Sequence, residues 1–112
     1  PDPVMPDPKI FGEKSIMVLG EFGGLGLPLE GHTWQQKDNW GYQSFSTAED
    51  LKARYSALID DLAKYIPRGL AAAVYTQTTD VEIETNGLMT YDRQVIKIAL
   101  EDLKKMHEKL YK

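Results

Sequence analysis

The fold is decided by the stretch Leu19-Gly20-Glu21-Phe22-Gly23-Gly24-Leu25-Gly26-Leu27-Pro28 and by the apolar residues before it. The run Ile16-Met17-Val18-Leu19 has no polar alternation, which is typical of a strand buried on both faces. Glycines around Glu21 let backbone or ligand approach this acid closely. An acid where a buried strand opens into a loop is a common place for chemistry in α/β barrels. On these residues alone, an ordinary solvated glutamate is the alternative.

Size and charge limit the classes of protein to which the chain can belong. Its 112 residues favour one domain with a small core. A net charge of −4 gives no support to a nucleic-acid partner or an anionic membrane surface, and no apolar run has the length of a membrane span. The absence of cysteine excludes disulfides and thiolate chemistry, and leaves the compartment open between cytoplasm and periplasm.

The pattern along the chain predicts two strands, each followed by a helix. A proline-rich extended lead-in over 1–14 comes first, and 15–112 are expected to form one structural unit. The expected elements are a strand over 15–19, a long aromatic loop over 23–45, a helix over 46–66, a strand over 70–75, an acidic loop over 80–87 with a short extended piece at Val81 and Ile83, and a helix over 92–110.

The first helix has the clearest signals. Ser46 and Glu49 fit a capping box, and Pro67 and Gly69 are expected to end the helix. An apolar stripe repeats at helical spacing and consists of Leu51, Tyr55, Leu58, Ile59, Leu62 and Ile66. For the last helix we expect Met106 to pack, His107 to lie on the surface, and the inner face to consist of Ile96, Ala99, Leu100, Leu103 and Leu110.

The order of strands and helices implies a parallel sheet that this chain cannot complete. Two β/α units give two parallel strands, yet parallel sheets are found almost only with both faces covered. We therefore expect the chain to be a piece of a larger sheet or barrel, or to self-associate.

Three motifs extend this picture and resemble a known family. They are Gly20-Glu21-Phe22-Gly23-Gly24-Leu25-Gly26, Asn39-Trp40-Gly41-Tyr42-Gln43, and the long segment 73–93 that contains Ala73-Val74-Tyr75-Thr76-Gln77-Thr78-Thr79-Asp80-Val81-Glu82 and Asn86-Gly87-Leu88-Met89-Thr90-Tyr91-Asp92-Arg93. Together they resemble the carboxyl-terminal end of the catalytic barrel of glycoside hydrolase family 2, the family of β-galactosidases and β-glucuronidases. The resemblance covers about Ser15 to Ala99, and the longest motif is the most specific.

The resemblance implies an α/β fold made of the last two β/α units of a (β/α)8 barrel, present as a partial barrel. It also implies that Glu21, at the end of the seventh strand, is the nucleophile of a retaining β-glycosidase. The family's acid/base is a glutamate that follows an asparagine, and the chain has no Asn-Glu pair. We therefore expect no turnover from this chain alone. Tyr75 lies nearest to the aromatic residue that ends the eighth strand in the family and packs beneath the sugar.

Further candidate residues for a sugar site lie in the loops. Trp34 and Trp40 are suited to stacking on sugar faces, with anchoring of the long loop as the alternative. His32 is suited to bonding a sugar hydroxyl, with simple solvation as the alternative. Asp80 and Glu82 are suited to hydroxyls or a cation, again with solvation as the alternative. No metal site or cofactor is expected, because no metal-binding loop spacing occurs.

Two functions follow for the chain. The first is a fragment of a retaining β-glycosidase, with a carbohydrate substrate and the rest of the parent barrel as its partners. The second is a non-catalytic carbohydrate-binding or assembly module derived from the barrel.

Overall fold

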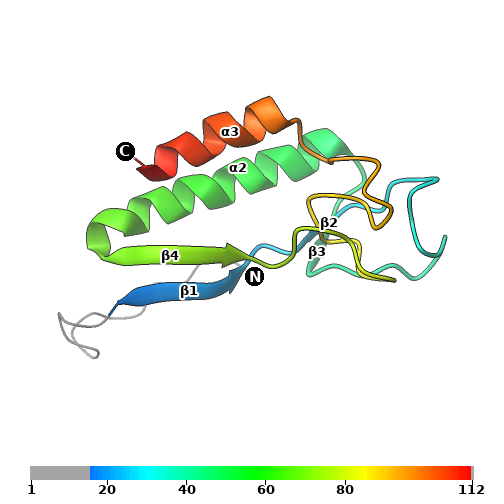
Figure 1. The fold of residues 1–112 in the computed structure, drawn as a ribbon, viewed down its shortest axis with the longest axis horizontal. Helices are drawn as coiled ribbons and strands as arrows, with labels where there is room; N and C mark the ends of the chain where they lie inside the picture. The colour runs from blue at the N-terminus through cyan, green and yellow to red at the C-terminus, as the bar shows by residue number, and fades with distance from the viewer. Residues whose placement is uncertain (1–15, 112) are drawn as a thin grey trace.

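A computed structural model describes residues 16–111, so the lead-in predicted over 1–14 lies outside the described residues. Within them the chain is a small mixed α/β unit with short parallel strands (Figure 1). Its strands are β1 (Met17–Phe22), β2 (Leu25–Gly26), β3 (Gln43–Ser44) and β4 (Leu70–Tyr75). Its helices are α2 (Ala48–Tyr65) and α3 (Leu100–Glu108), which continue into 3-10 turns at Ile66–Arg68 and Lys109–Tyr111.

β1 and β4 pair in parallel, as the order of elements predicts. The predicted second strand is confirmed at both ends, since β4 covers Leu70–Tyr75. The first strand extends further than predicted. It continues to Phe22, because this residue still has a partner in Tyr75 of β4. Glu21 therefore belongs to the strand itself rather than to a turn after it.

An irregularity in β1 decides which of its side chains face the core. Leu19 lies opposite Ala73 and Phe22 lies opposite Tyr75, so β1 carries one residue more than β4 in this interval. Leu19 and Phe22 both pack against the core, whereas Gly20 and Glu21 between them are exposed. An extra residue of this kind is a β-bulge, a device that re-aims side chains beside functional sites.

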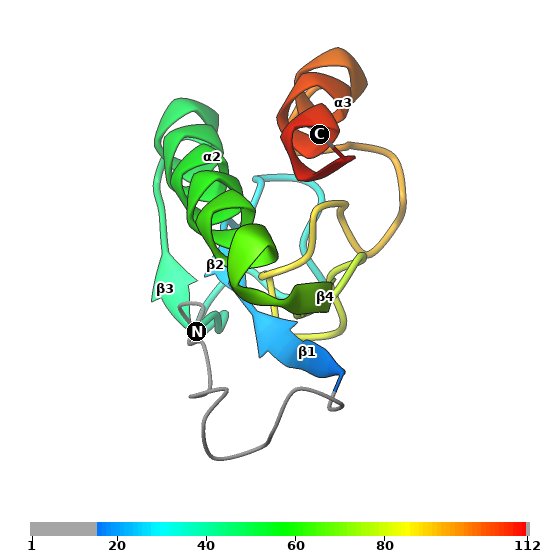
Figure 2. The same ribbon diagram turned by 90° about the vertical axis from the view of Figure 1, so that its left-hand side faces the viewer.

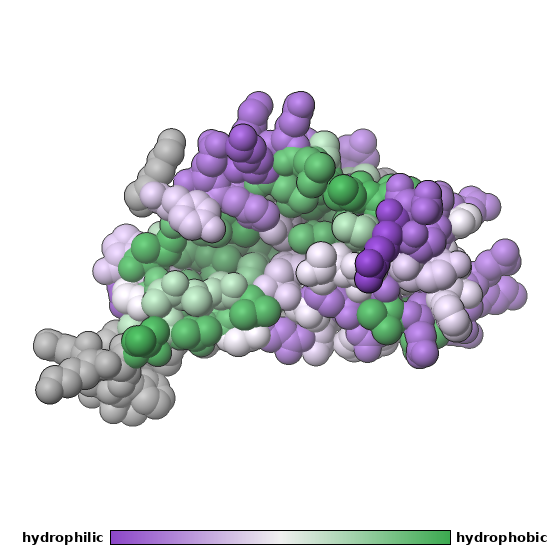
Figure 3. All heavy atoms as spheres, viewed as in Figure 1, coloured by the Kyte–Doolittle hydropathy of each residue, from purple (hydrophilic) through white to green (hydrophobic). Residues whose placement is uncertain are grey.

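The helices lie on one side of the β1–β4 pair and leave its other face open (Figures 1 and 2). The prediction that the first strand is buried on both faces is therefore wrong. Ile16 is 79% exposed, Val18 55% and Val74 of β4 52%. Hydrophobic side chains consequently gather at the surface along the strands (Figure 3). The described part of the chain has no second layer with which to cover them.

Helix α2 supplies the largest share of the core. Its apolar stripe is confirmed for the five residues before the helix end, which are Leu51, Tyr55, Leu58, Ile59 and Leu62. They pack with Phe22 of β1, Leu70 of β4 and residues from the loops and α3. Ile66 is only partly buried, because it begins the 3-10 turn that follows the helix.

The predicted end of α2 is confirmed, but its predicted cap is wrong by one residue. Pro67 lies in the 3-10 turn, and Gly69 has a φ of 109°, the left-handed conformation that glycine tolerates best. At the other end the N-cap is Thr47 rather than Ser46. The Thr47 hydroxyl accepts a hydrogen bond from the Asp50 backbone N–H at 3.2 Å.

The last helix begins eight residues later than predicted, because side-chain hydrogen bonds hold the segment before it in turns. The Asp92 carboxylate accepts from the Thr90 hydroxyl at 2.6 Å and from the Gln94 backbone N–H at 3.1 Å. The Lys97 N–H then donates to the Leu88 carbonyl instead of to a helical partner. α3 starts only at Leu100.

The inner face of α3 also differs from the prediction. Leu103 and Met106 are buried, as expected. Leu100 is 66% exposed and Ile96 is 38% exposed, since Leu100 merely begins the helix and Ile96 precedes it. His107 is partly buried rather than a surface residue, because it bonds to Tyr55 of α2 at 2.6 Å.

The two long loops are ordered against each other. In the first, β2 and β3 pair in parallel through Leu25 with Gln43 and Gly26 with Ser44. The Leu27 N–H then donates to the Thr85 carbonyl in the second loop at 2.8 Å. That second loop makes a tight turn in which Val81 pairs with Glu84, so the extended piece predicted at Val81 and Ile83 is wrong. In the described part of the chain no helix has the length and apolar character needed to cross a membrane.

Packing of α2 can be tested by changing leucine to alanine at a buried and at an exposed position. Leu58→Ala removes a fully buried side chain, so we expect it to lower the free energy of unfolding by about 2–5 kcal/mol. The control is Leu100→Ala, the same change at a residue that is 66% exposed, where we expect about 0.5 kcal/mol or less. Urea unfolding followed by circular dichroism measures both, and equal losses would contradict this packing.

Candidate functional site

The candidate site lies where β1 and β4 end and the two long loops meet. Parallel strands bring their carboxyl ends to one edge of a sheet, and in open α/β folds ligands bind at this edge. Glu21 is the penultimate residue of β1 and is exposed there. The bulge described above turns its carboxylate away from the core.

The charge of Glu21 acts on the hydroxyl of Tyr42, a residue just before β3. The negative charge of Glu21 is the main cause that raises the pKa of Tyr42 above its ordinary value of 10.0. Partial burial, a hydrogen bond to Glu21 and the charge of Glu84 raise this pKa further. At neutral pH the phenol is therefore protonated, and its O–H is a donor suited to a neighbouring carboxylate.

Trp40 stands beside Tyr42 and is fixed by the acidic loop. Its N–H donates to the Ile83 carbonyl at 2.6 Å, and its carbonyl accepts from the Thr85 N–H at 2.7 Å. The rings of Trp40 and Tyr42 meet edge to face with centroids 4.8 Å apart. Both rings remain accessible, with Trp40 43% exposed and Tyr42 52% exposed. The site thus presents two rings next to one carboxylate.

Gly24 makes this approach possible. It has a φ of 80°, and a Cβ there would collide with the Tyr42 ring. Any other residue at position 24 would strain the backbone and push Tyr42 away from its place near Glu21.

A buried ion pair holds the acidic loop that fixes Trp40. Lys97 Nζ donates to Asp80 Oδ1 and to the Thr85 carbonyl, both at 2.8 Å, and its side chain is fully buried. Asp80 Oδ1 also accepts from the Gly87 N–H at 2.9 Å. Burial raises the pKa of Asp80 and lowers that of Lys97, and their mutual hydrogen bond opposes both shifts. For Asp80 the alternative of simple solvation is therefore wrong, because its side chain is buried. Glu82 is exposed, so solvation agrees with its position.

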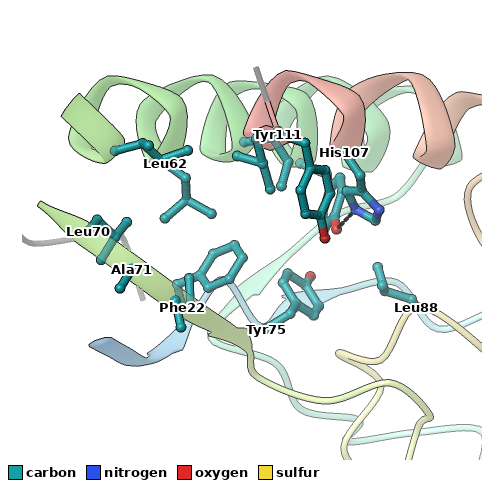
Figure 4. A pocket seen from close by; sticks show the side chains of 14 residues that line it. Phe22, Leu62, Leu70, Ala71, Tyr75, Leu88, His107 and Tyr111 are labelled. Atoms are coloured by element: carbon teal, nitrogen blue, oxygen red, sulfur yellow. Dashed lines mark hydrogen bonds between the residues drawn. The ribbon is translucent and has the colours of Figure 1, made fainter. Parts of the chain in front are cut away.

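Tyr75 points toward the helices rather than along the strand ends (Figure 4). Its ring meets Phe22 with centroids 5.4 Å apart and Tyr55 at 5.3 Å. Its hydroxyl accepts from the Leu25 N–H at 3.2 Å, and burial raises its pKa. These contacts give Tyr75 a packing role, and its predicted contact with a sugar stays a prediction.

His32 and Trp34 have partners in another part of the loops. His32 Nδ1 lies 2.8 Å from the Asp92 carboxylate, and the Trp34 and Tyr91 rings meet edge to face at 5.8 Å. Hydrogen bonds from Thr90 and His32 lower the pKa of Asp92 to about 2. These contacts anchor the long loop, the alternative considered for Trp34. Of the predicted binding residues, Trp40 lies nearest to the site in this sense: its ring contacts Tyr42, on which the charge of Glu21 acts.

Two features of the site were missed in the sequence. Tyr42 belongs to a quoted motif, and its position two residues after Trp40 was the available signal. Gln77 donates to the Asn86 side chain, a fully buried residue whose Nδ2 has no partner among the described residues. No sequence signal distinguishes such a buried asparagine from an ordinary turn residue.

Chemically, the site offers one accessible carboxylate with a phenol donor and an aromatic surface. The described residues contain no group of three or more side chains that could hold a metal ion. In comparisons with known proteins, no family model and no curated protein matches this chain. What the site can do therefore rests on its geometry.

The contact between Glu21 and Tyr42 can be measured directly. Glu21→Gln removes the charge that raises the pKa of Tyr42, so we expect that pKa to fall toward 10.0. Glu84→Gln should lower it less, and Glu82→Gln should leave it unchanged. NMR of 13C-labelled tyrosine rings during a pH titration measures the value. An unchanged Tyr42 pKa in Glu21→Gln would contradict the contact.

The buried pair makes a second prediction. Lys97→Met leaves the Asp80 carboxylate buried without its cation, so we expect a loss of about 3–5 kcal/mol in the free energy of unfolding. Adding Asp80→Asn should recover part of this loss. The control is Lys109→Met, which breaks a half-exposed pair with Asp60 and should cost about 0–1 kcal/mol. Equal losses in urea unfolding for the two lysine variants would show that the Asp80–Lys97 pair is not buried.

Proposed function

We propose that the chain is part of a retaining β-glycosidase similar to glycoside hydrolase family 2, and that Glu21 is its nucleophile. The observation that carries this proposal is the position of Glu21, which is exposed at the carboxyl edge of a parallel strand pair and whose charge raises the pKa of Tyr42. A strand end provides the rigid aim that a nucleophile needs.

The proposed chemistry uses two carboxyl groups, of which this chain supplies one. Glu21 attacks the anomeric carbon and forms a glycosyl ester, while a second carboxylic acid gives its proton to the leaving oxygen. Water, deprotonated by that second group, then attacks the same carbon and frees Glu21. Retaining enzymes hold the two groups about 5–5.5 Å apart. We propose that the second group comes from the remainder of the parent protein.

Tyr42 and Trp40 have separate roles in this proposal. We propose that the Tyr42 hydroxyl donates to one oxygen of Glu21 in the complex with substrate, which leaves the other oxygen to attack. Trp40 offers an accessible ring to the apolar face of the sugar. Trp34 and His32 would not touch the sugar; they would anchor the loop that carries Trp40 and Tyr42.

The proposed architecture is the last two β/α units of a barrel. Its support is the open face of the β1–β4 pair, where apolar side chains such as Val18 and Val74 are half-exposed or more. Parallel sheets bury both faces, so this face is suited to the interior of a closed barrel.

The second candidate is a carbohydrate-binding module without catalysis. The accessible Trp40–Tyr42 pair favours it, because stacking requires neither an ionised carboxylate nor a second acid. The two candidates differ in whether Glu21 forms a bond to the sugar.

Covalent labelling separates them. In a β-galactoside with fluorine at the second sugar carbon and a dinitrophenolate leaving group, the leaving group departs without a proton, so the missing acid is not needed. We expect mass spectrometry to find the sugar attached to Glu21 of the purified chain. Glu21→Gln should abolish the adduct, and the matched control Glu84→Gln should keep it.

The alternative results are distinct. Quenching of Trp40 fluorescence by the sugar without any adduct would favour the binding module and contradict the nucleophile. An adduct on Glu84 would also contradict it. If the sugar neither binds to the chain nor forms an adduct, both candidates are contradicted.

A further inference from the structure

The acidic loop contains the pair Asn86-Gly87, whose own chemistry the proposed function does not use. The Asn86 side chain is completely buried. A Cβ added to Gly87 would lie 2.5 Å from the Asp80 nitrogen, closer than real Cβ atoms approach. The packing of the loop therefore imposes a glycine directly after a buried asparagine.

An asparagine followed by glycine has an intrinsic reactivity. The Gly87 backbone nitrogen, once it has lost its proton, can attack Asn86 Cγ, because glycine has no side chain to hinder the approach. A bond forms between this nitrogen and Cγ, the bond from Cγ to Nδ2 breaks, and Nδ2 takes up a proton and leaves as ammonia. The five-membered succinimide that results adds water at either carbonyl carbon and opens to aspartate or isoaspartate. Water is the only co-reactant that these steps consume.

The folded loop holds both reacting atoms in place. The Gly87 N–H donates to Asp80 Oδ1 at 2.9 Å in the interior. Loss of this proton would put a negative nitrogen beside a carboxylate, so the contact opposes the first step. Asn86 Oδ1 accepts from Gln77 Nε2 at 2.5 Å, which fixes the orientation of Cγ. The attack requires the nitrogen to reach Cγ along a defined direction, and these two hydrogen bonds restrain both atoms.

Lys97 holds the carboxylate on which the first restraint depends. Its Nζ donates to Asp80 Oδ1 and to the Thr85 carbonyl, both at 2.8 Å. It thereby connects the acceptor of the Gly87 N–H with the residue that precedes Asn86. The Asp80–Lys97 pair is almost completely shielded from water, so the restraint persists as long as the loop stays closed.

Conversion of Asn86 would reach the aromatic pair of the candidate site. A Cβ added to Gly41 would lie 3.4 Å from Asn86 Cβ, so this side chain packs against the residue between Trp40 and Tyr42. Aspartate would bury a negative charge at a position without exposed surface, which is unfavourable. Isoaspartate would lengthen the main chain directly after Thr85, whose N–H donates to the Trp40 carbonyl. Neither product fits the closed loop.

We propose that Asn86-Gly87 is a modification site that the fold protects through Asp80, Lys97 and Gln77, and that opening of the acidic loop allows its irreversible conversion to aspartate or isoaspartate. The closed loop keeps Asn86 intact, whereas an opened loop exposes the pair to water and base. A converted chain then loses the fixed arrangement of Trp40 and Tyr42. The inference stands on the loop alone and does not depend on the chemistry of Glu21.

Ageing of the whole chain in mildly alkaline buffer, followed by peptide mass spectrometry, tests the reactivity. The sequence has two asparagines, and Asn39 is the internal control because the Trp40 side chain after it hinders the same attack. In urea we expect Asn86 to convert well ahead of Asn39. In the folded chain Asn86 should convert at least about tenfold more slowly than in urea, because only molecules with an opened loop react.

Two variants remove the restraints separately. Gln77→Met takes away the donor to Asn86 at nearly the same side-chain length, and Lys97→Met takes away the cation that holds Asp80. We expect each to speed conversion in the folded chain by about tenfold. The matched control for the first is Gln36→Met, the same change at an exposed residue, which should alter the rate by less than about twofold.

Instability alone is excluded with a second control. Lys97→Met also destabilises the fold, so Leu58→Ala serves as a destabilised variant in which the loop restraints are intact. Urea unfolding gives the unfolded fraction of each variant. After correction for this fraction, Leu58→Ala should convert at the wild-type rate and Lys97→Met should not. If Lys97→Met does not fold, Gln77→Met still decides the outcome.

The consequence for the site is tested with Asn86→Asp, which reproduces one product. We expect the Trp40 and Thr85 amides to exchange hydrogen at least about tenfold faster than in the wild type, because their bonds to the neighbouring loop open. Gln36→Glu adds the same charge at an exposed position and should leave both amides protected.

Four results would overturn the proposal. Equal conversion of Asn86 in the folded chain and in urea would show that the fold gives no protection. Conversion of Asn86 no faster than that of Asn39 in urea would show that the pair is not reactive. Wild-type rates in both Gln77→Met and folded Lys97→Met would show that these residues do not restrain it. Unchanged Trp40 and Thr85 exchange in Asn86→Asp would remove the link to the site. The labelling of Glu21 uses freshly prepared chain, so its success or failure is independent of all four.

Discussion

The packing of one face of α2 against the β1–β4 pair supports every other feature of this molecule. Leu58, Ile59 and Leu62 are almost completely buried, and Phe22 and Leu70 meet them from the strands. This contact joins segments far apart in the sequence, so it forms only when the strands, the helix and their connections are in place together. It also fixes the strand ends, and with them the positions of Glu21 and of the loops that surround it.

A different kind of interaction organises the loops, which have few helical or strand hydrogen bonds of their own. The Asp80–Lys97 pair is buried and ties the acidic loop to the segment before α3. Thr85, which accepts from Lys97, also donates its N–H to Trp40. The aromatic pair beside Glu21 therefore depends on a charged contact that touches neither ring. Desolvation offsets much of the attraction in a buried ion pair, but loss of one partner leaves an uncompensated charge, so the loop keeps the arrangement in which Asp80 and Lys97 meet.

Much of the regular structure could be predicted, because it depends on local patterns. The helical stripe of α2, its stop at Pro67 and Gly69, and the limits of β4 follow from spacing and from glycine and proline chemistry. The late start of α3 could not be predicted, since it results from the Asp92 hydrogen bonds to Thr90 and Gln94. The burial of Asp80 depends on Lys97, which lies 17 residues further along the chain. The place of Glu21 was expected at a strand end, but Tyr42 as its partner depends on how the long loop returns to β1.

The bulge in β1 leaves open space for a side chain next to the Glu21 carboxylate. Gly20 is exposed beside Glu21, and a Cβ added to Gly20 would meet no atom within 4 Å. A substitution there would add a side chain next to the acid while displacing nothing in the core. A single codon change could therefore give this edge a new hydroxyl, amide or charge, so that the site can diversify while the fold beneath it stays the same.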